Sequence, residues 1–155
     1  MEAKMNLDEI SIAMPIEEKL LKPLHDWGAR MDWTNLKHVH LIHVVKRSIA
    51  PFEFGVVEIP DEKTYASMKS TLEKFLKDEA KKIFPTDFKG EVSVHLSIHS
   101  HPEEELVNIL KHINSHLVVV ATEGKHGLEG FFHNSFTDHL VRFAPCDVFV
   151  VRPVK

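Results

Sequence analysis

Short runs of apolar and β-branched residues alternate along this chain with stretches whose apolar residues recur at helical spacing. These runs predict five strands separated by four helices, the strands at residues 9–14, 37–45, 91–99, 117–120 and 148–151. Strands joined through helices by short, right-handed crossovers form a parallel, doubly wound sheet. We therefore expect a single α/β domain over residues 1–155, with a five-stranded, mostly parallel sheet and helices on both faces.

Local signals refine this outline at three places. The first helix is expected to end near Met31, but Pro23 lies within its apolar stripe, so the helix either starts just before that proline or kinks there. Asp61 is the expected cap of a long helix that runs to about Phe84. In residues 91–99, apolar residues alternate with Ser and His, and one polar face indicates a strand at the edge of the sheet.

The connection at residues 46–60 is unusually apolar, because it contains Ile49, Phe52, Phe54, Val56, Val57 and Ile59. A long irregular segment of this kind is often functional or contacts a partner. Its apolar content also suits a segment that wraps the edge of the core. We expect the second arrangement.

Composition excludes several classes of partner. The formal net charge is −4, which argues against a nucleic acid bound through a basic surface. No run of residues approaches the roughly 18 apolar residues of a membrane span, so no membrane partner is expected. One cysteine makes no internal disulfide and suits a reducing compartment, so we expect a cytoplasmic protein.

Two apolar segments carry a resemblance to a known family. Leu41-Ile-His-Val-Val45 is similar to the second strand of the universal stress proteins, in which a His-Val pair ends the strand, and Ala144-Pro-Cys-Asp-Val-Phe-Val-Val-Arg152 is similar to their last strand. The resemblance extends over almost the whole chain. It implies the fold of the adenine-nucleotide alpha-hydrolase class and a site for ATP, accompanied by Mg²⁺, at the carboxyl ends of the strands.

The phosphate loop of that family, G-x2-G-x9-G-[ST], aligns here with altered glycines. Ala121 and Asn134 stand at its first and third glycine positions, while Gly124 and Ser135 match. Glycine allows positive φ and lets backbone N–H groups approach a phosphate, and Asn is the next most tolerant residue at positive φ. The aspartate that ATP-binding members carry after the first strand is replaced by Pro15. These departures predict a degenerate site whose affinity for ATP is weak or lost.

The resemblance places the candidate nucleotide-binding residues around one crevice, where strands end and the last helix begins. The candidates are Ala13, Met14, Pro15, Val44, Val120, Ala121, Gly124, Gly127, Asn134, Ser135, Phe136 and Thr137. The glycines also suit an ordinary turn between a strand and a helix that binds no ligand.

The twelve histidines raise a separate possibility. His38 and His40 share one side of the second strand, and His95 and His99 share one side of the third. If these strands are neighbours, facing imidazoles form a site for Zn²⁺ or Ni²⁺. The alternative is a set of solvated or hydrogen-bonded histidines without metal.

The sequence favours binding over catalysis. It contains neither a G-x-S-x-G nucleophile motif nor a G-x-x-x-x-G-K-[ST] phosphate loop, and Pro15 removes the expected carboxylate for Mg²⁺. We expect a stress-response module that is not an enzyme; the alternatives are an interaction dimer that acts without nucleotide and a His-rich metal-binding protein. The resemblance also implies a homodimer through the last strand, Val148, Phe149, Val150 and Val151.

Overall fold

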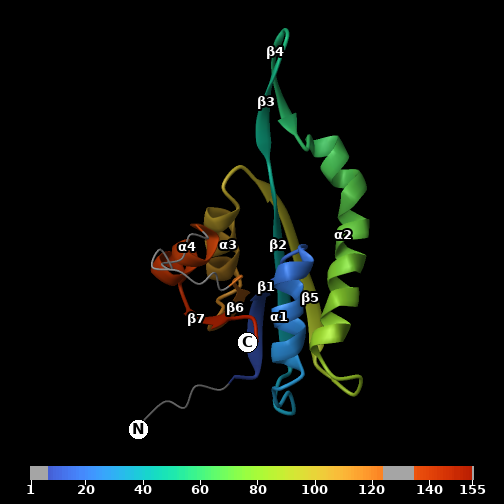
Figure 1. Ribbon diagram of the computed structural model, residues 1–155, viewed down its shortest axis with the longest axis vertical. Coiled ribbons are helices and arrows are strands. Elements are labelled where there is room, and N and C mark those ends of the chain that lie inside the picture. The colour runs from blue at the N-terminus through green and yellow to red at the C-terminus, as the bar shows by residue number, and fades with distance from the viewer. Residues whose placement is uncertain (1–6, 124–134, 155) are drawn as a thin grey trace.

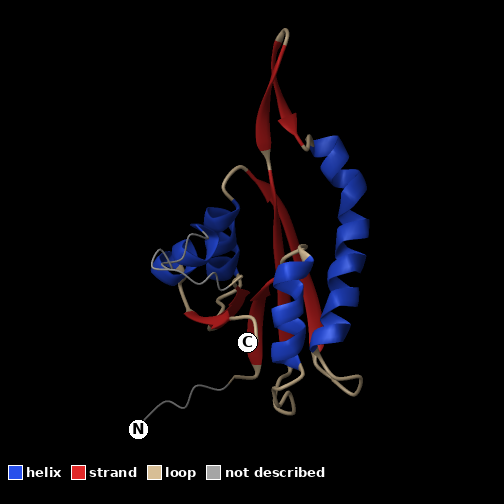
Figure 2. Ribbon diagram, viewed as in Figure 1, coloured by secondary structure: helices blue, strands red, loops and turns tan. Residues whose placement is uncertain are grey.

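A computed structural model describes residues 7–123 and 135–154. Its main feature is a five-stranded parallel sheet in the order β5-β2-β1-β6-β7 (Figures 1 and 2). The strands are β1 (Glu9–Ala13), β2 (His38–Lys46), β5 (Glu91–His99), β6 (Leu117–Ala121) and β7 (Asp147–Val151). The expected α/β class and parallel sheet are confirmed, and β5 occupies an edge as its polar alternation indicated.

Helices cover both faces of the sheet. Figure 1 shows the first pair on one face and the second pair on the other; the helices are α1 (Glu18–Gly28), α2 (Glu62–Ile83), α3 (Pro102–His112) and α4 (Ser135–Phe143). Each face has its own apolar core. Ile12 and Leu24 are buried between the sheet and the α1/α2 pair, and Val118 and Leu140 are buried on the α3/α4 side. Alternate side chains of the central strands β1, β2 and β6 point toward opposite faces of the sheet.

Two helix boundaries follow from local chemistry. Asp61 caps α2 as expected, because its carboxylate accepts a hydrogen bond from the Thr64 backbone N–H at 2.7 Å. Of the two alternatives expected for α1, a start just before Pro23 is wrong, since the helix begins at Glu18 and holds Pro23 inside it. It ends at Gly28, short of the expected Met31, where a glycine allows α1 to approach α2.

The segment that follows β2 departs most from expectation. Residues 46–60 do not wrap the core, because they form an antiparallel hairpin of β3 (Ser48–Phe52) and β4 (Gly55–Ile59) that projects beyond the sheet (Figure 1). The apolar residues of this hairpin are exposed, Phe54 at 87%. Gly55 follows the two-residue turn with φ +152°, a conformation that glycine accepts readily. The structure therefore places an apolar arm in solvent.

Candidate functional site

The carboxyl ends of three strands meet at the centre of the sheet. β1 pairs with β2 on one side and with β6 on the other, so that Ala13 lies between Ile42 and Val120. The backbone N–H of Met14 donates to the carbonyl of Ile42 at 2.8 Å, and this bond extends the ladder one residue past β1. The chain continues from β1 toward β2, whereas β6 lies on the opposite side. This change of direction is the place where ligands bind in open α/β sheets.

The structure brings several of the predicted nucleotide-binding residues to this point. Ala13, Val44 and Val120 point into the core on the α3/α4 side, and Met14 and Ala121 point into the core on the α1/α2 side. All five are buried, and Met14 is only 3% exposed. Their side chains thus form the apolar floor beneath the strand ends.

One residue of this region was not among the predicted site residues. His43, on β2, donates from Nδ1 to the carbonyl oxygen of Met14 at 2.8 Å, since that carbonyl can only accept. Burial lowers the pKa of His43, and the hydrogen bond to Met14 offsets this only in part. The ring is therefore neutral at pH 7 and holds the chain where it leaves β1. The His-Val pair of the family resemblance was the available signal for this residue.

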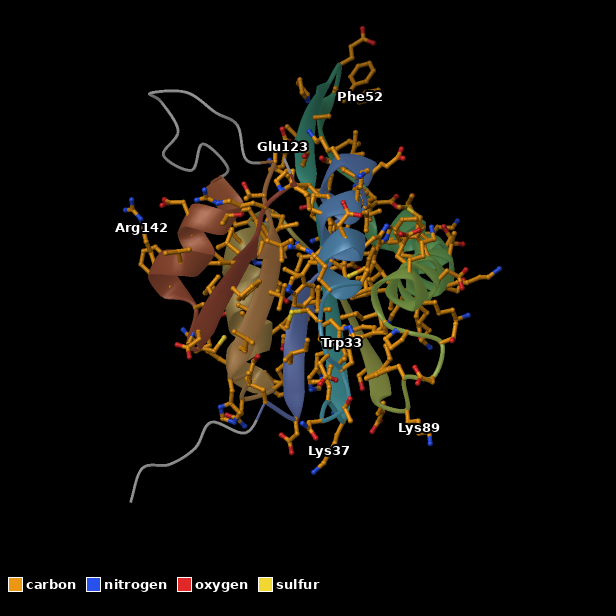
Figure 3. All side chains as sticks on the ribbon, turned by 60° about the horizontal axis from the view of Figure 1, so that its bottom comes forward. Trp33, Lys37, Phe52, Lys89, Glu123 and Arg142 are labelled. Carbon is orange, nitrogen blue, oxygen red and sulfur yellow. The ribbon has the colours of Figure 1, made fainter. Side chains whose placement is uncertain are left out.

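An ion pair connects α1 to the end of β6. Lys19 Nζ lies 2.6 Å from Glu123 Oε1 and 3.4 Å from Glu17 Oε2. The hydrogen bond to Glu123, followed by the one to Glu17, raises the pKa of Lys19. Figure 3 shows Glu123 at the end of the sheet opposite to Lys37, which precedes β2. The Lys19 side chain thus connects α1 to the segment that follows β6.

The first turn of α4 lies beyond the loop after β6. α4 begins at Ser135, and its first turn has backbone N–H groups without intrahelical partners and the positive end of the helix dipole. Phe136 packs against the α3/α4 core. Thr137 is fully buried, and its hydroxyl has no hydrogen-bond partner within residues 7–123 and 135–154. The other predicted residues of this region, Gly124, Gly127 and Asn134, lie outside the described residues.

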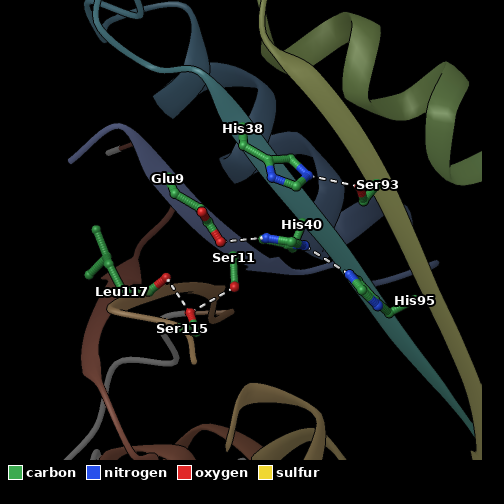
Figure 4. A network of polar contacts seen from close by, with 8 residues as sticks. All are labelled: Glu9, Ser11, His38, His40, Ser93, His95, Ser115 and Leu117. Atoms are coloured by element: carbon green, nitrogen blue, oxygen red, sulfur yellow. Dashed lines mark hydrogen bonds and ion pairs between the residues drawn. The ribbon is translucent and has the colours of Figure 1, made fainter. Parts of the chain in front are cut away.

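The predicted histidine cluster forms at the opposite end of the sheet, with different members. His40 Nδ1 lies 2.8 Å from His95 Nε2, which confirms that β2 and β5 bring these rings together. The inclusion of His99 is wrong, because it lies four residues, about 13 Å, further along β5 and accepts from the backbone N–H of His101. Glu9, which was not predicted, takes its place: its Oε1 lies 2.6 Å from His40 Nε2 (Figure 4).

A groove of about 840 Å³ runs over the edge strand β5 between α2 and α3. Its lining includes His95, Glu105 and His112. Ser97 donates to Glu105 across part of it at 2.8 Å. The groove does not include the strand ends described above, so it is a separate feature of the surface.

Comparison with known proteins identifies the family. The universal stress protein family matches residues 15–152, which is most of the 155-residue chain. The chain belongs to the universal stress protein family. Among curated proteins, no similar sequence was found.

Solved structures of universal stress proteins share this fold at low sequence identity. UspA from Lactobacillus plantarum is 16% identical, with a TM-score of 0.60 over 96% of this chain and 100% of that chain. A universal stress protein in complex with cAMP is 15% identical, with a TM-score of 0.61 over 96% of this chain and 99% of that one. One from Archaeoglobus fulgidus in complex with dAMP is 12% identical, with a TM-score of 0.54 over 94% and 97%. At these identities, the likeness concerns the fold.

None of the helices in the described part of this universal stress protein is both long and apolar enough to cross a membrane.

Proposed function

We propose that this chain is a single-domain, cytoplasmic stress-response module that binds an adenine nucleotide weakly and acts by binding rather than by catalysis. The observation that carries the proposal is that the carboxyl ends of β1, β2 and β6 lie side by side at the point where the strand order reverses. The structures of relatives in complex with cAMP and dAMP support an adenine nucleotide as the ligand class.

The residues at the strand ends fit a nucleotide in two respects. Met14 and Val44 are apolar and buried, as suits a surface beneath a purine. The first turn of α4 supplies positive charge for a phosphate.

The same residues fit Mg²⁺ poorly. Pro15 has no ligand atom in its side chain, and the carboxylates of Glu17 and Glu123 both pair with Lys19. Mg²⁺ requires oxygen ligands and is usually held by one or two carboxylates together with phosphates. We therefore expect nucleotide binding to persist when Mg²⁺ is removed by EDTA.

Calorimetric titration of the nucleotide-stripped protein with ATP, with and without Mg²⁺, tests this function. We expect saturable binding, and tighter binding by Ala121→Gly, because that change restores the family glycine, which allows positive φ and a closer approach of the backbone to a phosphate. Ala66→Gly, at an exposed position of α2, is the matched control and should leave affinity unchanged. The absence of binding by both the wild type and Ala121→Gly would refute the proposal.

A second candidate function is contact with another copy of the chain that does not depend on nucleotide. β7 is a sheet edge, and its Phe149 remains 44% exposed while contacting Trp27. This supports the expected homodimer through Val148–Val151. The hairpin β3-β4 adds six exposed apolar residues, which is typical of a protein-contact surface. Light scattering with and without ATP separates the two functions. Contact that does not depend on nucleotide predicts the same molecular mass and the same affinity between copies in both conditions. The nucleotide-dependent function predicts that ATP changes one of these two quantities.

A further inference from the structure

The amino-terminal end of the sheet carries polar side chains where a core would be expected. On the face covered by α3 and α4, the apolar residues of β1 and β2 are Ala13, Ile42 and Val44, near the carboxyl ends. Toward the start of the same strands, the residues on this face are Glu9, Ser11, His38 and His40. Buried polar groups destabilise a fold unless they are satisfied by hydrogen bonds or a bound ion. Ser11 Oγ lies 2.8 Å from Ser115 Oγ, which leaves Glu9, His38 and His40 as the residues with metal-ligand atoms.

We infer that Glu9, His38 and His40 form a binding site for a divalent transition metal ion of the zinc type. Each residue offers one ligand atom, and the three atoms lie within 4.8 Å of one another. Around a tetrahedral Zn²⁺, ligand atoms are about 3.4 Å apart, as follows from Zn–N and Zn–O bonds of about 2.0–2.2 Å. To reach it, the longest separation must shorten by at most about 1.4 Å, and the 2.6 Å contact between His40 Nε2 and Glu9 Oε1 must lengthen. Two imidazoles and one carboxylate, with a position left for water, are a known ligand set for zinc.

The partners of the two imidazoles support this assignment. His38 Nε2 lies 2.7 Å from Ser93 Oγ, and His40 Nδ1 lies 2.8 Å from His95 Nε2. With protons on those nitrogens, His38 and His40 donate to β5 and keep Nδ1 and Nε2, respectively, as lone-pair ligands. Metal-binding histidines almost always donate their second ring N–H in this way, which orients the ring. The heavy atoms of these outer contacts are thus in place, and metal binding requires the His40 proton to move from Nε2, which faces Glu9, to Nδ1, which faces His95.

Burial and access also suit a bound ion. The His40 side chain is 9% exposed, so its ring has little freedom, whereas the carboxylate of Glu9 is 40% exposed and leaves a path for an ion to enter. In the absence of metal, His40 Nε2–H donates to Glu9 at 2.6 Å, and this contact satisfies both groups. Metal binding replaces that proton, so affinity is expected to fall in acid. The site lies at the opposite end of the sheet from the proposed nucleotide site and does not depend on it.

Competition of the full-length protein with a chromophoric Zn²⁺ chelator tests the inference. We expect one tightly bound Zn²⁺ per chain, accompanied by a rise in Tm. Glu9→Gln and His38→Gln should each abolish that binding, and Ser93→Ala should weaken it about 10- to 100-fold, as outer-contact substitutions do. His99→Gln is the matched control, because it removes a histidine of the same strand face at the far end of β5.

Glu9→Gln keeps an acceptor for His40, so it should fold like the wild type, and circular dichroism of the metal-free variants checks this. The inference would be overturned if Glu9→Gln and His38→Gln, both folded, retained the tight Zn²⁺. It would also be overturned if the wild type bound no Zn²⁺ in competition with the chelator, or lost its Zn²⁺ on His99→Gln alone.

Discussion

We predict that the buried hydroxyl of Thr137 couples the stability of the free protein to nucleotide binding, by donating to a phosphate when a nucleotide is bound. Thr137 is fully buried in the first turn of α4, and its Oγ1 has no partner in the described part of the chain. A buried polar group without a partner costs about 1–3 kcal/mol. Thr137→Val replaces the hydroxyl by a methyl group of similar size. We expect the free energy of unfolding to rise by about 1 kcal/mol, which corresponds to about 2–4 °C in Tm for a domain of this length.

The same substitution should weaken nucleotide binding. A hydrogen bond to a charged phosphate contributes about 1.5–3 kcal/mol, so its loss raises Kd about 10- to 150-fold. Chemical denaturation gives the stability, and calorimetry with ATP gives the affinity. Thr71→Val, at an exposed position of α2, is the control and should change neither quantity by a comparable amount. A destabilised Thr137→Val protein with unchanged Kd would refute the reasoning, because the hydroxyl would then have its partner in the free protein.

Three further predictions concern helix packing, pH dependence and the hairpin. Gly28→Ala should lower the free energy of unfolding by about 1–3 kcal/mol in urea denaturation, because its Cβ would lie 2.2 Å from the Ile83 carbonyl oxygen. A free energy of unfolding equal to that of the wild type would contradict this close contact. Burial lowers the pKa of His43 below its unfolded value, so the free energy of unfolding should fall as pH drops below about 6.5. His43→Gln should flatten that part of the profile of stability against pH. Identical profiles for the variant and the wild type would exclude His43 as a source of this pH dependence. The double substitution Phe52→Ser and Phe54→Ser should leave Tm nearly unchanged, since both side chains are exposed, but reduce self-association measured by light scattering; an unchanged mass at all concentrations would count against the hairpin as a contact surface.

The parallel sheet was predictable because its central strands are buried on both faces. Val118–Val120, for example, form a continuous apolar run that only a central strand accommodates. The hairpin was not predictable from the same rule, since Val56 and Val57 are as apolar as core residues and yet lie in solvent. Their exposure depends on how far β2 and β5 extend past β1, which local patterns do not encode.

The histidine cluster was predictable only in part, because alternation gives the face on which a side chain lies but not the register between strands. Alternation along each strand correctly placed His38 and His40 on one face of β2 and His95 on the same face of the neighbouring strand β5. The choice between Glu9 and His99 required the alignment of three strands, which set Glu9 opposite His38 and His99 opposite Lys46. Long-range pairing of this kind is fixed by the whole fold.

A crystal structure of the protein grown with ATP tests the central claim most directly. We predict a nucleotide at the carboxyl ends of β1, β2 and β6, with its phosphates toward the first turn of α4 and its base near Met14 and Val44. Density for a nucleotide elsewhere, or none at concentrations that saturate any calorimetric signal, would contradict it.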